Sequence, residues 1–423
     1  MKATTRINGI TQLSSWDLRF VWRMAGGVQV VNRAVVGVLW SVCLASGLLA
    51  DDSLELLGTV RIPGTARDLS GETAVLENGE AVNRTGGFSA LDYTGRDRLY
   101  AALSDRGPDD GAVSYPCRVQ FYEITISPGA HPAVRADLRK TVRLKDSQGR
   151  PLTGRSTLLQ ASETLGRRLD PEGLRLGPAG TFYISDEYGP EILAFDASGL
   201  EQRSFTLPGY FRVQRPNGDR DAENAANTAG RASNRGMECL ALSADGKSLL
   251  GLMQGPLLQD GRREGKKILG RACRLLELQL GSGAVREYVY ELDSEANGNS
   301  ELLAVDATRL LVLERDGGSG ENAAYRRLVL IDLSGATDIS GIERLPEDPA
   351  GAGIRPVKKR VWLDLLDPRW NLAGAGMPEK IEGLTFGEVL ADGRRTLLVG
   401  TDNDFESASD SLIWVFAFAQ TPQ

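Results

Sequence analysis

The chain has 423 residues, of which 25% are charged, 41% are hydrophobic and 6% are aromatic, and its formal net charge is −7. It contains no block of lysines and arginines, which argues against nucleic acid or an anionic membrane surface as a partner. The length is ample for a large core. The 49 glycines, set between short apolar runs, favour a turn-rich β protein over a helical one.

The N-terminal region carries the only membrane-related signal. Residues 34–49 form an apolar run that is too short and too rich in small residues for a transmembrane helix. We interpret residues 1–50 as a signal peptide, with an uncleaved anchor as the alternative. A start at Met24 would give a signal of ordinary length and make residues 1–23 a wrongly assigned extension. The remaining domain, 51–423, is expected to be secreted or periplasmic, without a membrane span.

An internal repeat follows the signal segment and is the most informative feature of the sequence. Each repeat begins with a short strand that contains three consecutive characteristic residues. The first, which we call the key residue, is followed by a small or apolar residue and then by a leucine. The key residue is a glutamate in four repeats and a serine in the first. These positions are Ser89, Glu172, Glu238, Glu301 and Glu382, spaced by 83, 66, 63 and 81 residues.

Each first strand is followed by a second strand that ends in a polar cluster, then by a third strand and, in most repeats, a fourth. The expected first strands are 87–93, 170–176, 236–242, 299–305 and 380–386. The second strands end at 103–106, 184–188, 252–255, 313–316 and 400–405. The third strands are 120–124, 192–196, 273–280, 327–333 and 412–418, and the fourth are 141–144, 203–207, 287–292 and 360–363. Polar residues fill an insertion at 209–235, and a basic loop spans 254–271.

Four antiparallel strands in each tandem repeat are typical of propeller blades. The sequence therefore predicts an all-β fold, a β-propeller of five or six four-stranded blades, the sixth hidden in the longer intervals. The last repeat ends after its third strand. Residues 54–62 form a spare strand before the first repeat, and we expect this N-terminal strand to close the ring as the missing fourth strand.

Carboxylates recur at one end of the predicted blades. The innermost strand of a blade lines the central channel, so the key glutamates should meet at one mouth of it. Because first and second strands are antiparallel, the polar clusters that end the second strands should face the same mouth. The inner row is Glu172, Glu238, Glu301 and Glu382, and the outer row is Asp105, Asp186 with Glu187, Glu314 with Asp316, and Asp402 with Asp404. Ser89 and Gln254 are gaps in the two rows.

A structural role is the alternative for the inner row, above all for Glu238 and Glu301. A glutamate at the start of each inner strand can accept main-chain N–H bonds from the neighbouring blade. In the doubled acids of the outer row, one member can make such a contact while the other binds a ligand. Nearby cationic side chains compensate the acidic ring and could also bind an anionic substrate.

Carboxylate oxygens without histidine or cysteine ligands suit Ca²⁺ or Mg²⁺ rather than Zn²⁺, and Ca²⁺ is the cation that we expect. The candidate catalytic residues are Asp105, Glu172, Asp186, Glu187, Glu238 and Glu382. The candidate substrate-binding residues are Arg106, Arg235, Arg315 and Lys380. The candidate metal ligands are Asp105, Asp186, Glu187, Asp402 and Asp404.

The histidine and cysteine content excludes several other kinds of active site. The single histidine, His131, lies in a loop that contains two prolines, and nothing in the sequence places it near the ring, so a Ser-His-Asp mechanism is not expected. The three cysteines after residue 50, Cys117, Cys239 and Cys273, allow at most one internal disulfide. They form no CxxC pair, which argues against a zinc or thiol redox site.

Collinear motifs between Gly86 and Phe418 resemble the phytase-like family, also called "esterase-like activity of phytase". The matching segments are GGFSALDY, LSDRGPDDG, DPEGLRL, YISDEYGPEILAFDASG, NRGMECLALSADGKSL, LMQGPL, NSELLAVD, LLVLERDGG, KIEGLTF and GTDNDF. The resemblance implies a propeller-type fold, an exported or periplasmic protein and hydrolysis of esters or phosphate esters. The RHGxRxP motif of histidine acid phosphatases is absent.

Two functions are consistent with these features. The first is an exported hydrolase that acts on phosphate esters or other esters with a carboxylate-bound divalent cation. The second is a non-catalytic propeller that binds a cation, a ligand or a protein partner at the same acidic face. In either case we expect a monomer, and for the hydrolase a small anionic substrate.

Overall fold

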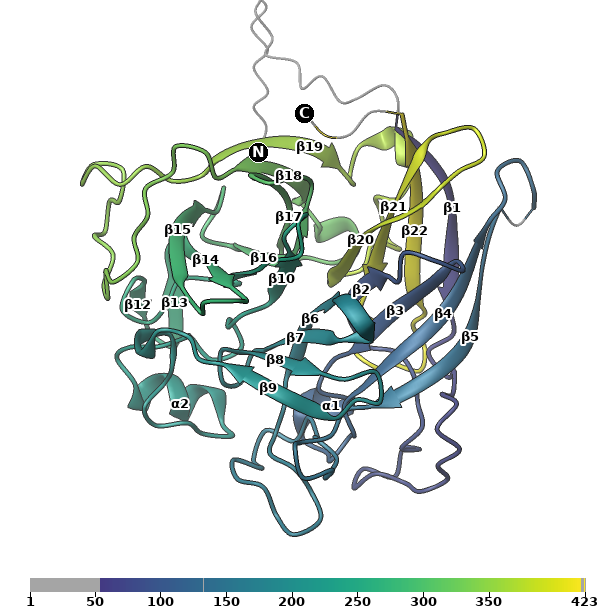
Figure 1. Ribbon diagram of the computed structural model, residues 1–423, viewed down its shortest axis with the longest axis horizontal. Coiled ribbons are helices and arrows are strands. Elements are labelled where there is room, and N and C mark those ends of the chain that lie inside the picture. Colours follow the sequence, from purple (N-terminus) through teal and green to yellow (C-terminus); the bar gives the residue numbers. More distant parts are fainter. Residues whose placement is uncertain (1–53, 132, 420–421, 423) are drawn as a thin grey trace, which may run out of the picture. The chain divides into compact units, whose positions relative to one another are not determined.

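The computed structural model describes residues 54–131, 133–419 and 422, so the expected signal peptide, 1–50, lies outside the described residues. The described chain is an all-β propeller of five four-stranded antiparallel sheets, arranged as blades around a central axis (Figure 1). It contains no sixth blade in these ranges. Long loops instead fill the two wider intervals, at 145–170 and 333–357.

The blades follow one another in chain order, and each begins with its innermost strand. Blade 1 is β2 (Phe88–Tyr93), β3 (Leu99–Ser104), β4 (Arg118–Ile126) and β5 (Val134–Arg143). Blade 2 is β6 (Pro171–Leu176), β7 (Phe182–Asp186), β8 (Glu191–Phe195) and β9 (Glu201–Phe205). Blade 3 is β10 (Cys239–Leu242), β11 (Ser248–Leu252), β14 (Ala272–Gln279) and β15 (Val285–Glu291). Blade 4 is β16 (Asn297–Ala304), β17 (Arg309–Asp316), β18 (Arg326–Asp332) and β19 (Lys358–Asp364).

Blade 5 combines strands from the two ends of the described chain. Its strands are β20 (Ile381–Val389), β21 (Arg395–Thr401), β22 (Ser411–Phe418) and β1 (Glu55–Ile62). β1 is the outermost strand and pairs antiparallel with β22, from Glu55 opposite Ala417 to Ile62 opposite Ser411. Around the axis, the inner strands β2, β6, β10, β16 and β20 each contact the next, which completes the ring.

Helical segments are short and lie in the loops. They are α1 (Pro108–Gly111), α2 (Arg220–Ala226) and the 3₁₀ turns η1 (Pro178–Gly180), η2 (Gly209–Phe211), η3 (Gly320–Asn322) and η4 (Pro368–Trp370). A separate hairpin, β12 (Arg262–Glu264) and β13 (Lys267–Leu269), is inserted in blade 3. Among the helices in the described ranges, none has the length and apolar character needed to cross a membrane.

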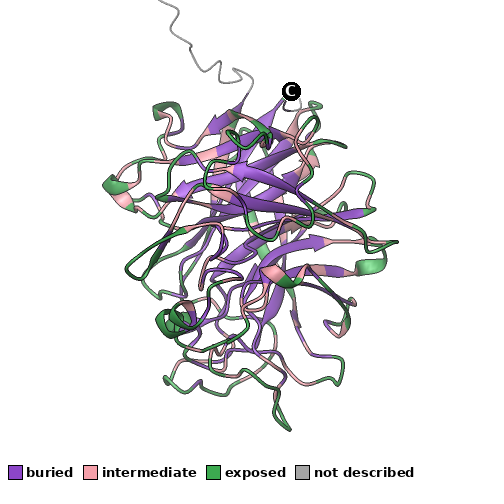
Figure 2. Cartoon of the chain, turned by 90° about the vertical axis from the view of Figure 1, so that its left-hand side faces the viewer, coloured by how far each residue is buried: buried purple, intermediate pink, exposed green. Residues whose placement is uncertain are grey.

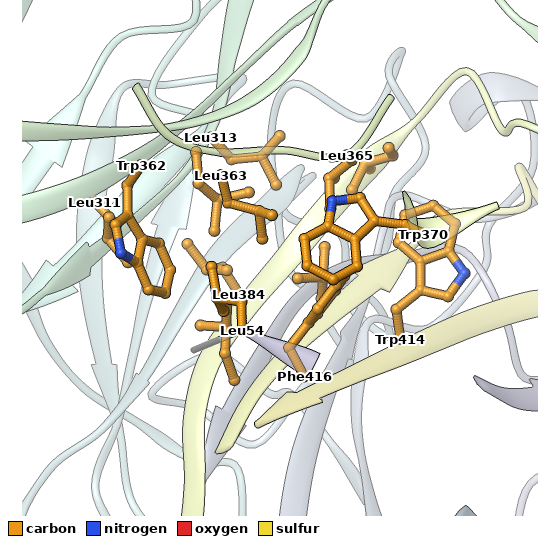
Figure 3. Close-up of a cluster of buried hydrophobic side chains, with 14 of the residues drawn as sticks. Leu54, Leu311, Leu313, Trp362, Leu363, Leu365, Trp370, Leu384, Trp414 and Phe416 are labelled. Carbon is orange, nitrogen blue, oxygen red and sulfur yellow. The ribbon is translucent and has the colours of Figure 1, made fainter. Parts of the chain in front are cut away.

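The core is divided among the interfaces between blades, because each blade has an apolar layer on both faces. Five large apolar clusters fill the five interfaces around the ring. β22 shows how the sequence achieves this: all of its residues are buried, and successive side chains point to opposite faces. Trp414 and Phe416 pack against blade 4 (Figure 3), whereas Ile413 and Val415 pack against blade 1. Exposed residues are concentrated in the loops (Figure 2).

A buried arginine crosses the centre of the channel. The Arg175 side chain, from β6, donates hydrogen bonds to the main-chain oxygens of Leu91, Leu302 and Leu384, on the inner strands of blades 1, 4 and 5. It also forms an ion pair with Glu301, 3.1 Å away, and both residues are almost fully buried. One guanidinium group therefore links four of the five blades, and its carboxylate partner belongs to blade 4.

We predict that Arg175→Met destabilises the protein by about 3–5 kcal/mol, because it removes the buried hydrogen bonds to the main chain of three blades together with the partner of Glu301. Urea unfolding followed by circular dichroism measures the loss. Arg135→Met is the matched control, since Arg135 is an exposed residue of the outer strand β5. Equal stabilities of the two variants would contradict a structural role for the buried pair.

Glu301 also predicts a pH dependence of stability. Burial raises the pKa of this carboxyl from 4.5 to about 8, and the charge of Arg175 only partly opposes this. The folded state then holds the proton more tightly than the unfolded state, so this contribution to stability is complete below about pH 4.5 and is lost as the pH rises through about 8. Glu301→Gln should therefore lose less unfolding free energy between about pH 5 and 9 than the unsubstituted chain. Parallel pH profiles of the two proteins would contradict the shifted pKa.

Candidate functional site

A cavity of about 590 Å³ lies at the channel mouth where the inner strands begin and the second strands end. All five blades contribute side chains to its wall. Its acidic residues are Asp105, Glu172, Asp221, Glu187, Glu238, Asp316, Glu379 and Glu382, and its basic residues are Arg106, Arg220, Arg235, Lys267, Arg315 and Lys380. The wall is therefore dominated by charge, as the carboxylate pattern in the sequence predicts.

β-bulges position the key side chains at this mouth. The register between first and second strands shifts at Ser89, Glu172 and Glu382, where one strand carries an extra residue. A bulge re-aims a side chain at the end of a strand. In blade 4 the extra residue is Ser300 rather than Glu301. Ser300 consequently lines the cavity, whereas Glu301 pairs with Arg175 farther along the channel.

Arg106 neutralises a first group of carboxylates. Its Nη1 atom lies 2.5 Å from Asp170 and 3.8 Å from Glu187, and its Nε atom lies 3.6 Å from Asp105. Asn234 accepts a further hydrogen bond from Nη2, at 2.7 Å. Burial alone would lower the pKa of Arg106, but Asp170 and Asp105 raise it well above its ordinary value. Arg106 is therefore a permanent cation inside the acidic group.

Arg315 and Lys380 neutralise the side of the cavity formed by blades 4 and 5. Arg315 donates to Glu382 at 2.8 Å and to the Ser300 hydroxyl at 2.9 Å. The Lys380 ammonium contacts three aspartates. They are Asp402 at 3.1 Å, Asp105 at 3.6 Å and Asp404. Three of the four expected substrate-binding cations are thus engaged by the protein's own carboxylates.

Three glutamates from neighbouring blades come together at the same mouth. Each of Glu172, Glu187 and Glu238 has a carboxylate oxygen within 4.8 Å of the other two. Glu187 accepts the Gly236 N–H at 2.7 Å, and a Cβ at residue 236 would lie only 2.7 Å from Glu187 Cγ, so a larger residue there would push the two apart.

Glu172 and Glu238 differ from Glu187 in having no hydrogen bond or ion pair within the described structure, although they are only 4% and 5% exposed. Burial and the charges of Glu238 and Asp105 raise the pKa of Glu172 well above its ordinary value. Burial and the charges of Glu187 and Glu382 do the same for Glu238. The pair therefore favours a bound proton or a bound cation.

Arg235 is the expected substrate-binding residue that has no carboxylate partner. Its Nη2 atom donates to the main-chain oxygen of Asn297 at 2.6 Å, and its buried Nε atom has no hydrogen-bond partner. Gly255 makes room for it, since a Cβ there would lie 2.6 Å from that Nε. Lys267, on the inserted hairpin, also lines the cavity without an ion-pair partner in the described residues.

The structure does not bring every candidate to the cavity. Asp186 accepts main-chain N–H bonds from Asp170 and Tyr188 and pairs with Arg167 at 3.2 Å, outside the cavity wall. Asp402 and Asp404 lie beyond Lys380 in a neighbouring depression. Burial raises the pKa of Asp402 to about 7, and Lys380 opposes that rise.

The remaining candidates of the rows have structural partners. Glu314 accepts bonds from the Tyr290 hydroxyl and the Asn297 amide, and Asp316 pairs with Arg326. His131 is exposed in the loop between β4 and β5. The three cysteines are buried and unpaired, so none forms a disulfide.

Two loop segments supply wall residues that the repeat does not predict. The insertion at 209–235 brings Arg220, Asn224 and Asn234 over the mouth, and the β12–β13 hairpin brings Lys267. Their polar and basic composition is visible in the sequence. Their position is not, because neither insertion belongs to the strand pattern that locates the other residues.

The sequence of residues 83–405 matches the family model named Phytase-like, described as "Esterase-like activity of phytase". A protein of the fungus Arthroderma benhamiae, named "Uncharacterized secreted protein", is 26% identical over 374 residues, covering 71% of each chain.

Similar solved structures are distant. Virginiamycin B lyase from Staphylococcus aureus is 12% identical, with 86% of this chain and 99% of that chain covered and a TM-score of 0.33. The tail fibre of Staphylococcus aureus phage P68 is 10% identical over 86% of this chain, which spans about half (52%) of that protein, with a TM-score of 0.38. Likenesses at these TM-scores carry no inference about this chain.

We predict that Arg106→Met costs about 3–5 kcal/mol of stability, because Asp170 is fully buried beside it and would lose its counter-charge. Adding Asp170→Asn should restore most of the loss, since the neutral amide needs no cation. Urea unfolding of both variants measures the coupling. A double variant no more stable than Arg106→Met would contradict the proposed compensation of charge.

Proposed function

We propose that this chain, which belongs to the phytase-like family, is a secreted β-propeller that hydrolyses a small phosphate ester in its central cavity. One observation carries the proposal. One cavity is lined both by the carboxyl groups of Glu172 and Glu238, which have no partner in the described residues, and by the cations of Arg235 and Lys267, which have no carboxylate partner there. The similar protein of Arthroderma benhamiae is named a secreted protein, which supports the proposal that the present chain is exported.

The basic side of the cavity suits an anionic group. The guanidinium group of Arg235 offers donors in a planar fork that matches phosphate oxygens. Within the described residues, the only hydrogen bond of this group is that from Nη2 to the main-chain oxygen of Asn297, so the guanidinium group keeps donor capacity for a ligand. Lys267 adds a second positive charge from the hairpin. Arg106, Arg315 and Lys380 instead keep their neighbouring carboxylates neutralised and contribute to the positive potential at the site.

The acidic side of the cavity suits the reacting end of the substrate. Its ligand atoms are all carboxylate oxygens, which fits a hard cation such as Ca²⁺. A cation bound there would lower the pKa of a bound water and offset negative charge on the ester. Arg235 and Lys267 would orient the phosphate so that the ester bond faces Glu172 and Glu238.

The proposal predicts phosphate release from nitrophenyl phosphate or phytate in the presence of Ca²⁺. Glu172→Gln should lower kcat by at least about 100-fold, the scale of losing a group that acts at the reacting bond. Arg235→Met should raise KM by about 10- to 100-fold, because a charge-assisted hydrogen bond contributes about 1.5–3 kcal/mol.

Two controls match the charge that each variant removes. Glu163→Gln removes an exposed carboxylate in the loop before β6, and Arg135→Met removes an exposed guanidinium group on β5, so both should leave turnover unchanged. Unaltered kinetics in Glu172→Gln and Arg235→Met would place the chemistry elsewhere. Binding of phosphate without release from either ester would favour the non-catalytic alternative.

A further inference from the structure

We propose that one calcium ion binds between Glu172, Glu187 and Glu238. Their carboxylate oxygens lie within 4.8 Å of one another, close enough for a single ion to contact all three. Glu172 comes from β6, Glu187 directly follows β7 and Glu238 directly precedes β10, so the ion would join blades 2 and 3. This site deepens the proposed function, but binding of the ion does not depend on turnover.

Two of the three carboxylates have neither a hydrogen bond nor an ion pair in the described residues. Glu172 and Glu238 are more than nine-tenths buried, line the cavity and have no hydrogen bond or ion pair in the described residues. A buried ionised group without a partner is costly, so such groups pair with a cation or take up a proton. Glu187 is held in place by the Gly236 N–H through Oε1, and its Oε2 lies 3.8 Å from Nη1 of Arg106, beyond hydrogen-bond distance.

The other clusters of carboxylates at this mouth each already contain an arginine or lysine side chain of the protein. Asp105, Asp170 and Glu172 also come within 4.8 Å of one another, but Arg106 contacts the first two. Around Asp402 and Asp404, the Lys380 ammonium fills the same role. In the three-glutamate group, Arg106 comes within 3.8 Å of Glu187, but no lysine or arginine of the described residues forms an ion pair with Glu172 or Glu238.

The ligand chemistry selects the class of ion. The three side chains offer only hard oxygen donors, and neither histidine nor cysteine contributes, which disfavours zinc. Ca²⁺ accepts six to eight oxygens in a flexible arrangement, whereas Mg²⁺ requires a near-ideal octahedron. Three carboxylates on one side, with the open cavity on the other, leave positions for water or a substrate oxygen. We therefore commit to Ca²⁺, with Mg²⁺ binding more weakly.

Isothermal titration calorimetry with CaCl₂ on chelator-treated protein tests the site directly. We expect one site per chain, with a dissociation constant of about 10⁻⁴–10⁻³ M or tighter, as in extracellular calcium modules. Glu238→Gln and Glu172→Gln should each weaken binding by at least about tenfold, since each removes one anionic ligand. Asp404→Asn and Glu163→Gln are the matched controls and should bind Ca²⁺ like the unsubstituted chain.

The outcomes separate this inference from the proposed function. Loss of binding in Asp404→Asn together with retention in Glu238→Gln would move the ion to the outer aspartates and overturn the inference. A titration in which CaCl₂ gives no heat of binding would also overturn the inference. Phosphate release in the presence of EDTA would show that hydrolysis does not require the ion. Circular dichroism of each variant checks folding, and a calcium-dependent rise in Tm that Glu172→Gln abolishes is the second readout should Glu238→Gln fail to fold.

Discussion

The ring depends on a single buried guanidinium group at its centre. Five blades surround a channel, and Arg175 bonds to main-chain oxygens of three other blades while pairing with Glu301. These bonds fix the spacing of the inner strands. The same strand, β6, starts at Pro171 and carries Glu172 at the cavity and Arg175 three residues later, so the arginine that links the blades and the carboxylate proposed to bind the ligand share one strand.

Compensation of charge then decides what the cavity can do. Arg106, Arg315 and Lys380 each lie among carboxylates, and these pairs convert most of the acidic mouth into a neutral framework. Among the described residues that line the cavity, Glu172 and Glu238 have no partner and Arg235 has no carboxylate partner. Polar groups that a fold buries without partners are uncommon and frequently mark functional sites. A cavity that offers both unpaired acids and an arginine without a carboxylate partner can bind a cation and an anion, which a uniformly acidic ring could not do.

The sequence predicts the architecture because the repeat and the strand alternation are local properties. Five inner strands, the polar ends of the second strands and the common face of the carboxylates all follow from spacing and period. The pairing of β1 with β22 adds a strand to the last blade, whose own repeat supplies three. The choice between five and six blades required the structure, since long loops and an additional blade occupy similar lengths of sequence.

The exact partners of single side chains could not be predicted in the same way. A bulge at Ser300 shifts the register of blade 4 by one residue, and this turns Glu301 from the cavity toward Arg175. Asp186 is the last residue of β7 and Glu187 the first residue of the turn that follows, and only Glu187 reaches the cavity. Lys267 and Asn234 come from insertions that follow no repeat.

A crystal structure of the protein grown with CaCl₂ and inorganic phosphate tests the central claim most directly. The account predicts a calcium ion about 2.3–2.6 Å from oxygens of Glu172, Glu187 and Glu238, the usual range for Ca²⁺. It also predicts a phosphate bound by the guanidinium group of Arg235. An ion bound by Asp402 and Asp404 instead, or glutamates paired through a shared proton in a cavity without phosphate, would contradict the account.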